Sequence, residues 1–255
     1  MTSEILNIYK PIGLSPLEAI KRFIEQNRAY KGLKMTYAGR LDPMAEGVLL
    51  VLTGAAVHKK DRYLKMDKEY EAEVLFGFET DTYDILGLPL KMKMGKISNK
   101  NIKQNIEKFH GEISLPLPPY SSYKVQGKPL FAWAREGRLN EIKIPTRRTK
   151  VHNIEFVKSY EIDLKDILNA TEQKINKVTG DFRQDEIKTK WRELTKSESG
   201  KKFKIVKIKF TVSSGTYIRS IAYELGKKLG TGAILFSLLR TRVGEYEVKD
   251  STKLS

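Results

Sequence analysis

An aspartate in an unusual setting is the first candidate for chemistry. Asp42 lies in the stretch AGRLDPMAEG, directly before Pro43 and shortly before the apolar run Val48–Leu52. A residue that precedes proline is pushed into extended geometry. The carboxylate should therefore project from a loop ahead of a buried strand, where reacting groups often sit, and it could serve as a nucleophile. An Asx turn or a surface ion pair with Arg40 is the alternative, and the local sequence alone favours it.

Two further candidates lie far along the chain, in the stretch GTYIRS (215–220). Tyr217 and Arg219 fall where a predicted strand turns into a helix, and a guanidinium beside a helix N-terminus can hold a carboxylate or a phosphate. An arginine beside a buried aspartate favours the ionised carboxylate that a nucleophile needs. An ordinary first-turn arginine on a solvated face is an equally good interpretation of Arg219. Tyr70 opens an alternating stretch and is either core or site.

Local patterns predict the elements that would position these groups. Ser15–Glu18 is a capping box, with a hydroxyl at N-cap, proline at N1 and a carboxylate at N3. The helix that it opens carries one apolar stripe of Ala19, Ile20, Phe23 and Ile24. Val48–Thr53 is predicted to be a buried strand, and Tyr70–Phe78 alternates like a second one. A third alternating strand at 204–212 should end in a turn, followed by a helix from about Ile218 to Leu229.

The remaining segments are predicted to include a helix, a loop and a charge-balanced stretch. Ile102, Ile106 and Phe109 mark a helix that Gly111 can end, and 114–129 is punctuated by proline and glycine like a loop. Residues 155–168 and 171–202 are charge-balanced and predict an inserted strand or helix with solvated connections, without a core of its own. Strands and helices mix without a regular βαβ rhythm. We expect an α+β fold, with a mixed, mainly antiparallel sheet flanked by helices, in one catalytic domain over 1–255.

Composition narrows the class of protein. The 255 residues are 40% hydrophobic and contain no cysteine, so the chain can bury a core but has neither a disulfide framework nor a thiol nucleophile. The three histidines lie far apart and lack the spacing of zinc ligands. The N-terminus does not resemble a signal peptide, and no apolar stretch is long enough to span a membrane. We expect a soluble, cytoplasmic protein.

The net charge of +16 is unevenly distributed. Residues 86–150 hold 14 Lys and Arg against 4 Asp and Glu, and residues 203–255 hold 10 against 4. Cations beside Tyr120, Tyr123 and Trp133 suit a polyanion with exposed bases. A surface that is merely rich in lysine for solubility is the alternative, but the charge favours a nucleic-acid partner.

Several stretches, taken together, resemble the pseudouridine synthases, and most closely the TruB-type synthases that act on uridine 55 of tRNA. They occur in the family's order as NIYKPIGLS (7–15), GRLDPMAEG (39–47), KEY (68–70) with DILG (84–87), PPYSSYK (118–124) with AREG (134–137), and SGTYIRS (214–220) with LRT (239–241). Each motif is weak by itself. The resemblance runs from about residue 5 to 155 and again from 204 to 248.

The resemblance implies the pseudouridine synthase fold and the isomerisation of a uridine within RNA. It makes Asp42 the catalytic aspartate, held by Arg219 rather than by Arg40, and it makes Tyr70 the residue that stacks on the flipped base. It also suggests a larger set of RNA-binding residues, namely Tyr37, Arg40, His58, Lys124, Arg135, Tyr217 and Leu239. No cofactor and no metal are expected. The expected partner is the T-arm stem-loop of tRNA, bound by a monomer, with no membrane and no nucleotide cofactor.

The sequence departs from the family pattern at identifiable places. YAGR (37–40) replaces the usual His-Thr-Gly-Thr, with Arg40 leaning toward the branches that act on ribosomal RNA, and His58 stands in place of a lysine. Residues 155–202 have no recognisable counterpart, and only 245–255 follow Gly244, where many relatives have an RNA-binding PUA domain. Two other hypotheses therefore stay open: the same chemistry on ribosomal or other RNA, and a non-catalytic RNA-binding or folding chaperone.

Overall fold

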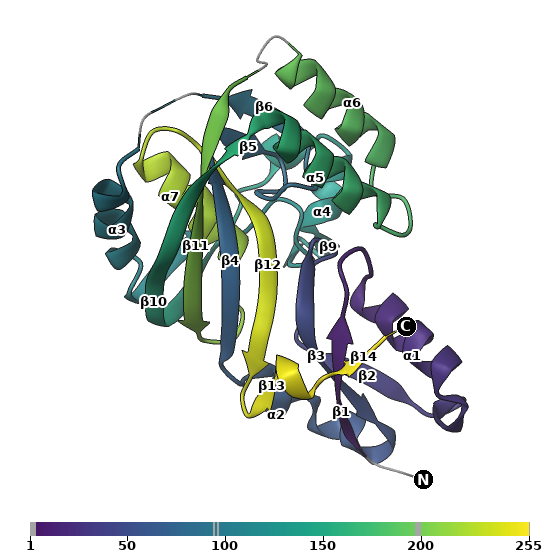
Figure 1. Cartoon of the computed structure of the whole chain (residues 1–255). Coiled ribbons are helices and arrows are strands. Elements are labelled where there is room, and N and C mark those ends of the chain that lie inside the picture. Colours follow the sequence, from purple (N-terminus) through teal and green to yellow (C-terminus); the bar gives the residue numbers. More distant parts are fainter. Residues whose placement is uncertain (1–3, 94, 96, 197–199, 255) are drawn as a thin grey trace.

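One large sheet forms the centre of the molecule in this computed structural model, which describes residues 4–93, 95, 97–196 and 200–254 (Figure 1). Eight strands follow the order β14-β1-β3-β12-β4-β11-β10-β7, with β2 added beside β3 and β13 beside β12. The pairs β1–β14 and β3–β12 are parallel and the other pairs are antiparallel. The predicted mixed, mainly antiparallel sheet is confirmed. The strands of this sheet are β1 (Ile5–Lys10), β2 (Met35–Ala38), β3 (Ala45–Thr53), β4 (Lys68–Phe76), β7 (Gly111–Pro116), β10 (Thr146–Asp163), β11 (Lys202–Val212), β12 (Ala233–Val243), β13 (Tyr246–Glu247) and β14 (Thr252–Lys253).

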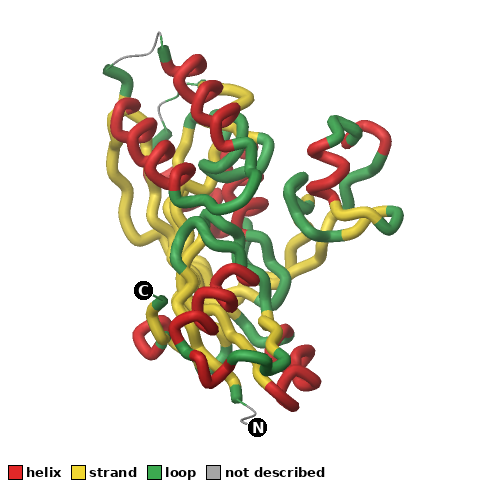
Figure 2. The backbone as a smooth tube through the Cα atoms, turned by 90° about the vertical axis from the view of Figure 1, so that its right-hand side faces the viewer, coloured by secondary structure: helices red, strands yellow, loops and turns green. Residues whose placement is uncertain are grey.

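Helices cover both faces of this sheet. Alternate residues of β4 and β11 pack against α3 and α7 on one face, and Leu75, Phe203 and Ile205 pack with α5 and α6 on the other (Figure 1). In Figure 2 the strands form a continuous layer, and one small group of helix, strand and loop projects from the body. The helices are α1 (Pro16–Gln26), α2 (Lys60–Leu64), α3 (Asn99–Glu107), α4 (Leu130–Arg135), α5 (Leu164–Asn176), α6 (Gln184–Thr195) and α7 (Ile218–Lys228), with 3₁₀ turns at Arg28–Tyr30, Gly54–Lys59, Leu139–Glu141 and Val248–Asp250. No helix in the described part of the chain is long and apolar enough to cross a membrane.

The local signals of the sequence explain how several elements begin and which face they bury. Both hydrogen bonds of the predicted capping box form at the start of α1, between Ser15 and Glu18. This helix buries Ala19, Ile20 and Phe23 against the sheet. The predicted alternation of β11 is also confirmed, because Val206, Ile208, Phe210 and Val212 all lie in the core that β11 shares with α7.

Two predictions about strand boundaries are wrong. The strand expected over 70–78 breaks at Gly77, whose φ of +97° is one that only glycine adopts readily. Phe78 therefore belongs to β5 (Phe78–Thr80), which pairs with β6 (Pro89–Met92), and its ring packs on the other face beside Trp191. The stretch 114–129 is not wholly loop, because β7 continues to Pro116 and a small hairpin pairs β8 (Lys124–Val125) with β9 (Lys128–Pro129).

The charge-balanced stretch 155–202 forms the second half of β10, then α5 and α6, and the first residue of β11. The two helices contact each other and bury Ile167, Ile175, Ile187 and Trp191 in a cluster shared with β4, β5 and β12. The Nε1 of Trp191 donates to the carbonyl of Gly87 at 3.1 Å. The two amphipathic helices thus share a core with one face of the sheet, and their charges lie on the solvent side.

Candidate active site

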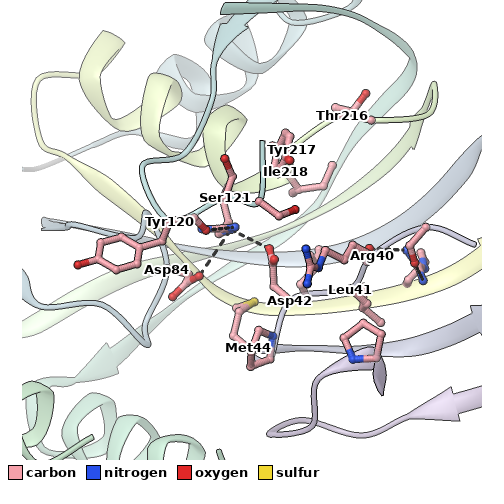
Figure 3. Close-up of a pocket in the computed structure, with 18 of the residues that line it drawn as sticks. Arg40, Leu41, Asp42, Met44, Asp84, Tyr120, Ser121, Thr216, Tyr217 and Ile218 are labelled. Atoms are coloured by element: carbon pink, nitrogen blue, oxygen red, sulfur yellow. Dashed lines mark hydrogen bonds and ion pairs between the residues drawn. The ribbon is translucent and has the colours of Figure 1, made fainter. Parts of the chain in front are cut away.

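A cavity of about 730 Å³ opens at the loop that precedes β3. Its wall is built by segments from the whole chain: the loop 39–44, Tyr70 on β4, the loop around Tyr120, the turn 213–217 and the connection between α5 and α6. Asp42 projects into it from the first of these segments, as Figure 3 shows. The loop ahead of β3 therefore does place this carboxylate at a cavity wall.

Asp42 and Arg219 form an ion pair in this cavity. The Nε of Arg219 donates to Oδ2 of Asp42 at 2.8 Å (Figure 3). The arginine side chain is 3% exposed and the aspartate side chain 32% exposed, so the cation is fixed in the wall while one side of the carboxylate faces the cavity. Arg40, the neighbour in sequence, forms no ion pair with Asp42.

The backbone holds the guanidinium of Arg219 in place. Its Nη1 donates to the carbonyl of Thr82 at 2.7 Å and its Nη2 to the carbonyl of Tyr120 at 3.2 Å. Arg219 reaches these carbonyls because it lies in the first turn of α7, just after the turn that ends β11. Three separate segments therefore fix one guanidinium, and through it the position of the carboxylate of Asp42.

Asp84 is a second carboxylate on the same guanidinium, and sequence analysis did not assign it a role. Its Oδ2 lies 3.6 Å from Nε of Arg219. Its Oδ1 accepts hydrogen bonds from the hydroxyl of Thr82 at 2.8 Å and from the backbone N–H of Leu86 at 2.9 Å. Burial raises the pKa of Asp84 to about 6, against the opposing effect of the Arg219 charge. Asp84 lies in the DILG stretch, so its place in a motif was the available signal.

Arg240 is buried below the loop that carries Asp42. Its Nε donates to the carbonyl of Val48 at 2.7 Å, and its Nη1 and Nη2 donate to the carbonyls of Arg40 and Gly39 at 3.1 and 3.3 Å. Arg240 also lines the cavity. The side chain thus ties β3 and the backbone just ahead of Asp42 to β12.

Two buried lysines, Lys68 and Lys10, hold backbone segments close to the cavity. Lys68 donates to the carbonyl of Leu64 at 2.7 Å, and burial lowers its pKa to about 8. Lys10 donates to the carbonyls of Pro11 and Leu14 at 2.9 and 2.8 Å, and burial lowers its pKa to about 7. The turn that Lys10 holds is joined to the Asp42 loop by a hydrogen bond from the Gly13 N–H to the Pro43 carbonyl.

Two tyrosines line the cavity near the ion pair. Tyr70 lies on β4, directly opposite Arg240 of β12, and its ring is mostly buried. Tyr217 precedes α7, and burial and the negative charge of Asp42 raise its pKa. An anchored carboxylate beside aromatic side chains can attack an electrophilic carbon and can hold a planar ring against the wall.

Comparison with known proteins identifies the family. Residues 26–174 match a family model described as "TruB family pseudouridylate synthase (N terminal domain)". The chain belongs to the TruB family. The tRNA pseudouridine synthase B of Clostridium acetobutylicum is 32% identical over 250 residues, which is 98% of this chain and 70% of that protein. That of Aquifex aeolicus is 30% identical over 249 residues, with 98% and 71% covered.

Solved structures share the fold at lower identity. A chain of an H/ACA RNP bound to a substrate RNA containing 2'-deoxyuridine matches with a TM-score of 0.59 and 22% identity, over 98% of this chain and 50% of that one. A chain of a Cbf5-Nop10-Gar1 complex gives the same TM-score and identity, over 98% and 52%. This TruB-family chain thus spans about half the length of its structural neighbours.

The other predicted RNA-binding residues of this TruB-family chain divide into two groups. Arg40 and Arg135 line the cavity, as does Tyr217. Tyr37 lies outside it, packed on β2 against the cluster beneath α1, with Nζ of Lys60 5.5 Å from its ring centroid. His58 lies exposed in the turn Gly54–Lys59.

Lys124 and Leu239 also lie outside the cavity. Lys124 is exposed on β8. Leu239 points to the opposite face of the sheet, because its neighbours Leu238 and Arg240 in β12 both line the cavity and strand residues alternate. Among the described residues, no cluster of three or more His, Cys, Asp or Glu side chains could hold a metal ion.

Proposed function

We propose that this TruB-family protein converts a uridine of tRNA into pseudouridine, and that the target is position 55 in the T arm. The observation that carries the proposal is the Asp42–Arg219 ion pair at the wall of a cavity of about 730 Å³. The relatives named tRNA pseudouridine synthase B support tRNA as the substrate. The same proposal has the protein act as a monomer, in the compartment that contains tRNA.

In this reaction the N1–C1′ bond breaks, a C5–C1′ bond forms, the hydrogen on C5 is lost and N1 gains one. The product is an isomer of the substrate, so no oxidant or group donor enters the balance. Asp42 acts as the nucleophile that forms a covalent bond to the substrate, and Arg219 holds the carboxylate in position. Tyr70 stacks on the uracil ring and is our candidate for the base that moves a ribose proton.

The target uridine has to leave its stack before it can react. C5 and C1′ cannot exchange bonds within a stacked helix, and enzymes that act on a base extrude it into a pocket. The cavity accepts the extruded nucleotide on the open side of Asp42. Arg40, Arg135 and Arg147, which line the cavity and reach solvent, then contact phosphates by charge, as RNA stems are recognised mostly by shape and backbone.

Pseudouridine formation on a T-arm stem-loop transcript tests the proposal directly. We expect the purified protein to release tritium from uridine labelled at C5, because that hydrogen is lost in the reaction. Asp42→Asn should abolish release while its affinity for the transcript stays close to that of the native protein. Release by Asp42→Asn at the native rate would disprove the role of Asp42.

A second candidate substrate is ribosomal or other RNA, favoured by Arg40 at the cavity mouth, where the family pattern has threonine. A map of pseudouridine in total RNA from cells with and without the gene separates the two substrates. Loss of the modification at tRNA position 55 is the expected result. Loss confined to ribosomal RNA would overturn the choice of tRNA.

A further inference from the structure

The connection between α5 and α6, residues 177–183, forms part of the cavity wall. Phe182 and Arg183 both line the cavity. Motif analysis of the sequence gave this segment no role. It contributes an aromatic ring and a cation to the cavity wall.

Hydrogen bonds within the connection give it a fixed conformation. The side-chain amide of Gln184 donates to the carbonyls of Val178 and Gly180 at 3.1 and 2.6 Å, and its oxygen accepts from the N–H of Phe182 at 2.9 Å. Arg183 adopts a left-handed conformation with φ +62°, which is uncommon for a residue with a side chain. The backbone that presents Phe182 is therefore ordered before any ligand binds.

The connection is also attached to the segments around it. The N–H of Thr179 donates to the carbonyl of Gly13 at 3.2 Å, in the turn next to the Asp42 loop. Arg183 forms an ion pair with Asp81 at 2.9 Å, and its guanidinium lies 4.4 Å from the ring centroid of Tyr120. The carbonyl of Tyr120 is one of those that hold Arg219. Tyr120 thus contacts both arginines, Arg183 through its ring and Arg219 through its carbonyl, and it links the α5–α6 connection to the Asp42–Arg219 ion pair.

The side chains at the cavity mouth combine exposed aromatic rings with cations. Phe182 is 39% exposed and Phe131, on α4, is 37% exposed, and both line the cavity. Arg135 donates to the carbonyl of Asp181 at 2.7 Å and lies 6.0 Å from the ring centroid of Phe182. Four exposed cations line the cavity against one exposed carboxylate, Asp61; the cations are Arg40, Lys65, Arg135 and Arg147.

Rings beside cations in a positively charged groove are the features that bind single-stranded nucleic acid, because bases stack on the rings and phosphates follow the charge. We propose that the α5–α6 connection is an RNA-binding element, in which Phe182 stacks on an unpaired base next to the target uridine. The proposal rests on the proposed function for the identity of the RNA. The segment that sequence analysis left without a role would then bind RNA together with α4, which it contacts through Arg135.

The affinity of Phe182 variants for a T-arm stem-loop transcript tests the proposal, with Asp42→Asn present throughout so that the RNA is not turned over. Loss of one base–aromatic stack should weaken binding about 5- to 150-fold in Phe182→Ala. Phe182→Trp should bind like the parent protein, since it keeps a ring, whereas Phe182→Leu should weaken binding although it stays apolar. The salt dependence of binding should keep its slope, because no phosphate contact is lost.

Val157→Ala is the matched control, because Val157 is also 39% exposed but does not line the cavity. It should leave affinity unchanged, and all these variants should unfold at the temperature of the parent protein. Equal affinity of Phe182→Ala and the parent would overturn the proposal, as would an equal loss in Val157→Ala. Turnover by the protein with native Asp42 reports separately on the proposed function, so RNA binding that depends on the Phe182 ring can be established whether or not turnover follows.

Discussion

At the floor of the cavity, Arg219 and Arg240 are buried and donate to backbone carbonyls, whereas at its mouth Arg40 and Arg147 reach solvent. All four residues are arginines and carry the same charge, so only their surroundings differ. A buried guanidinium with fixed partners has a single orientation, so it can set the geometry of a reacting group. An exposed one samples many orientations and attracts phosphates from a distance.

The difference between the buried and the exposed arginines predicts two kinds of functional defect in variants. Changes at the floor should lower the rate of the chemical step and the stability of the fold, because they leave buried charges unpaired. Changes at the mouth should lower affinity for RNA and alter its dependence on salt, with little effect on the rate at saturation.

The largest effect is expected from Arg219→Ala at the floor. Removing the guanidinium leaves Asp42 without the partner that positions it and leaves Asp84 buried without its counter-charge. We expect the single-turnover rate to fall on the order of 100-fold or more and the fold to lose about 3–5 kcal/mol, while RNA affinity changes little. Arg219→Lys should recover stability better than rate, since lysine keeps the charge but lacks the planar fork. If Arg219→Ala lowered mainly the affinity for RNA, the proposed role of the buried arginines in the chemical step would be contradicted.

A smaller effect is expected on the pH dependence of stability, through Asp84. Its pKa is raised in the folded protein to about 6 from an ordinary 3.8, so the folded state binds the proton more tightly than the unfolded state. That contribution to stability is complete below about pH 3.8 and is lost as the pH rises through about 6. Relative to Asp84→Asn, the native protein should lose on the order of 3 kcal/mol between these limits. Urea unfolding of both proteins across pH 3 to 7 measures the difference, and parallel curves would contradict it.

The smallest effect is expected from Arg147→Ala at the mouth. One phosphate contact fewer should weaken RNA binding a few-fold and reduce the slope of log Kd against log salt by about 1, with the rate at saturating RNA unchanged. Arg148→Ala is the control, because Arg148 is exposed beside it, faces Glu112 and does not line the cavity. A change in rate from Arg147→Ala would show that the mouth also shapes the chemistry.

The sequence predicts those parts of the site in which only a few residue types can be partners. Asp42 and Arg219 are 177 positions apart, yet a carboxylate on a loop and an arginine at a helix start could be matched by charge and by motif order. Lys68 and Arg240 lie in the motif-like stretches KEY and LRT, but they were given no role, because their partners are backbone carbonyls, which residue type does not reveal. Tyr37 and Leu239 lie in motif-like positions, but the face of the strand decides where each side chain points, and motif order does not give that face.

The sequence also does not show which face of the sheet a residue takes, and this explains the wrong prediction for the strand over 70–78. Alternation continues from Tyr70 to Phe78 in the letters of the sequence, and only the positive φ of Gly77 moves Phe78 to the other face. Charge balance in 155–202 left strand and helix as alternatives, because the apolar positions that the two helices bury, such as Ile167 and Trp191, are spread among many charges.

The place of β12 in the sheet bears on how the protein is made. This strand is synthesised long after β3 and β4, yet it lies between them in the sheet, and it carries Arg240, which holds the Asp42 loop. A nascent chain that stops before residue 233 exposes the facing edges of β3 and β4, which are the kind of unpaired edge that invites aggregation. The sheet closes only through contacts distant in sequence, which form slowly. Maturation of the site should therefore wait until residues 233–243 have left the ribosome and can pair with β3 and β4.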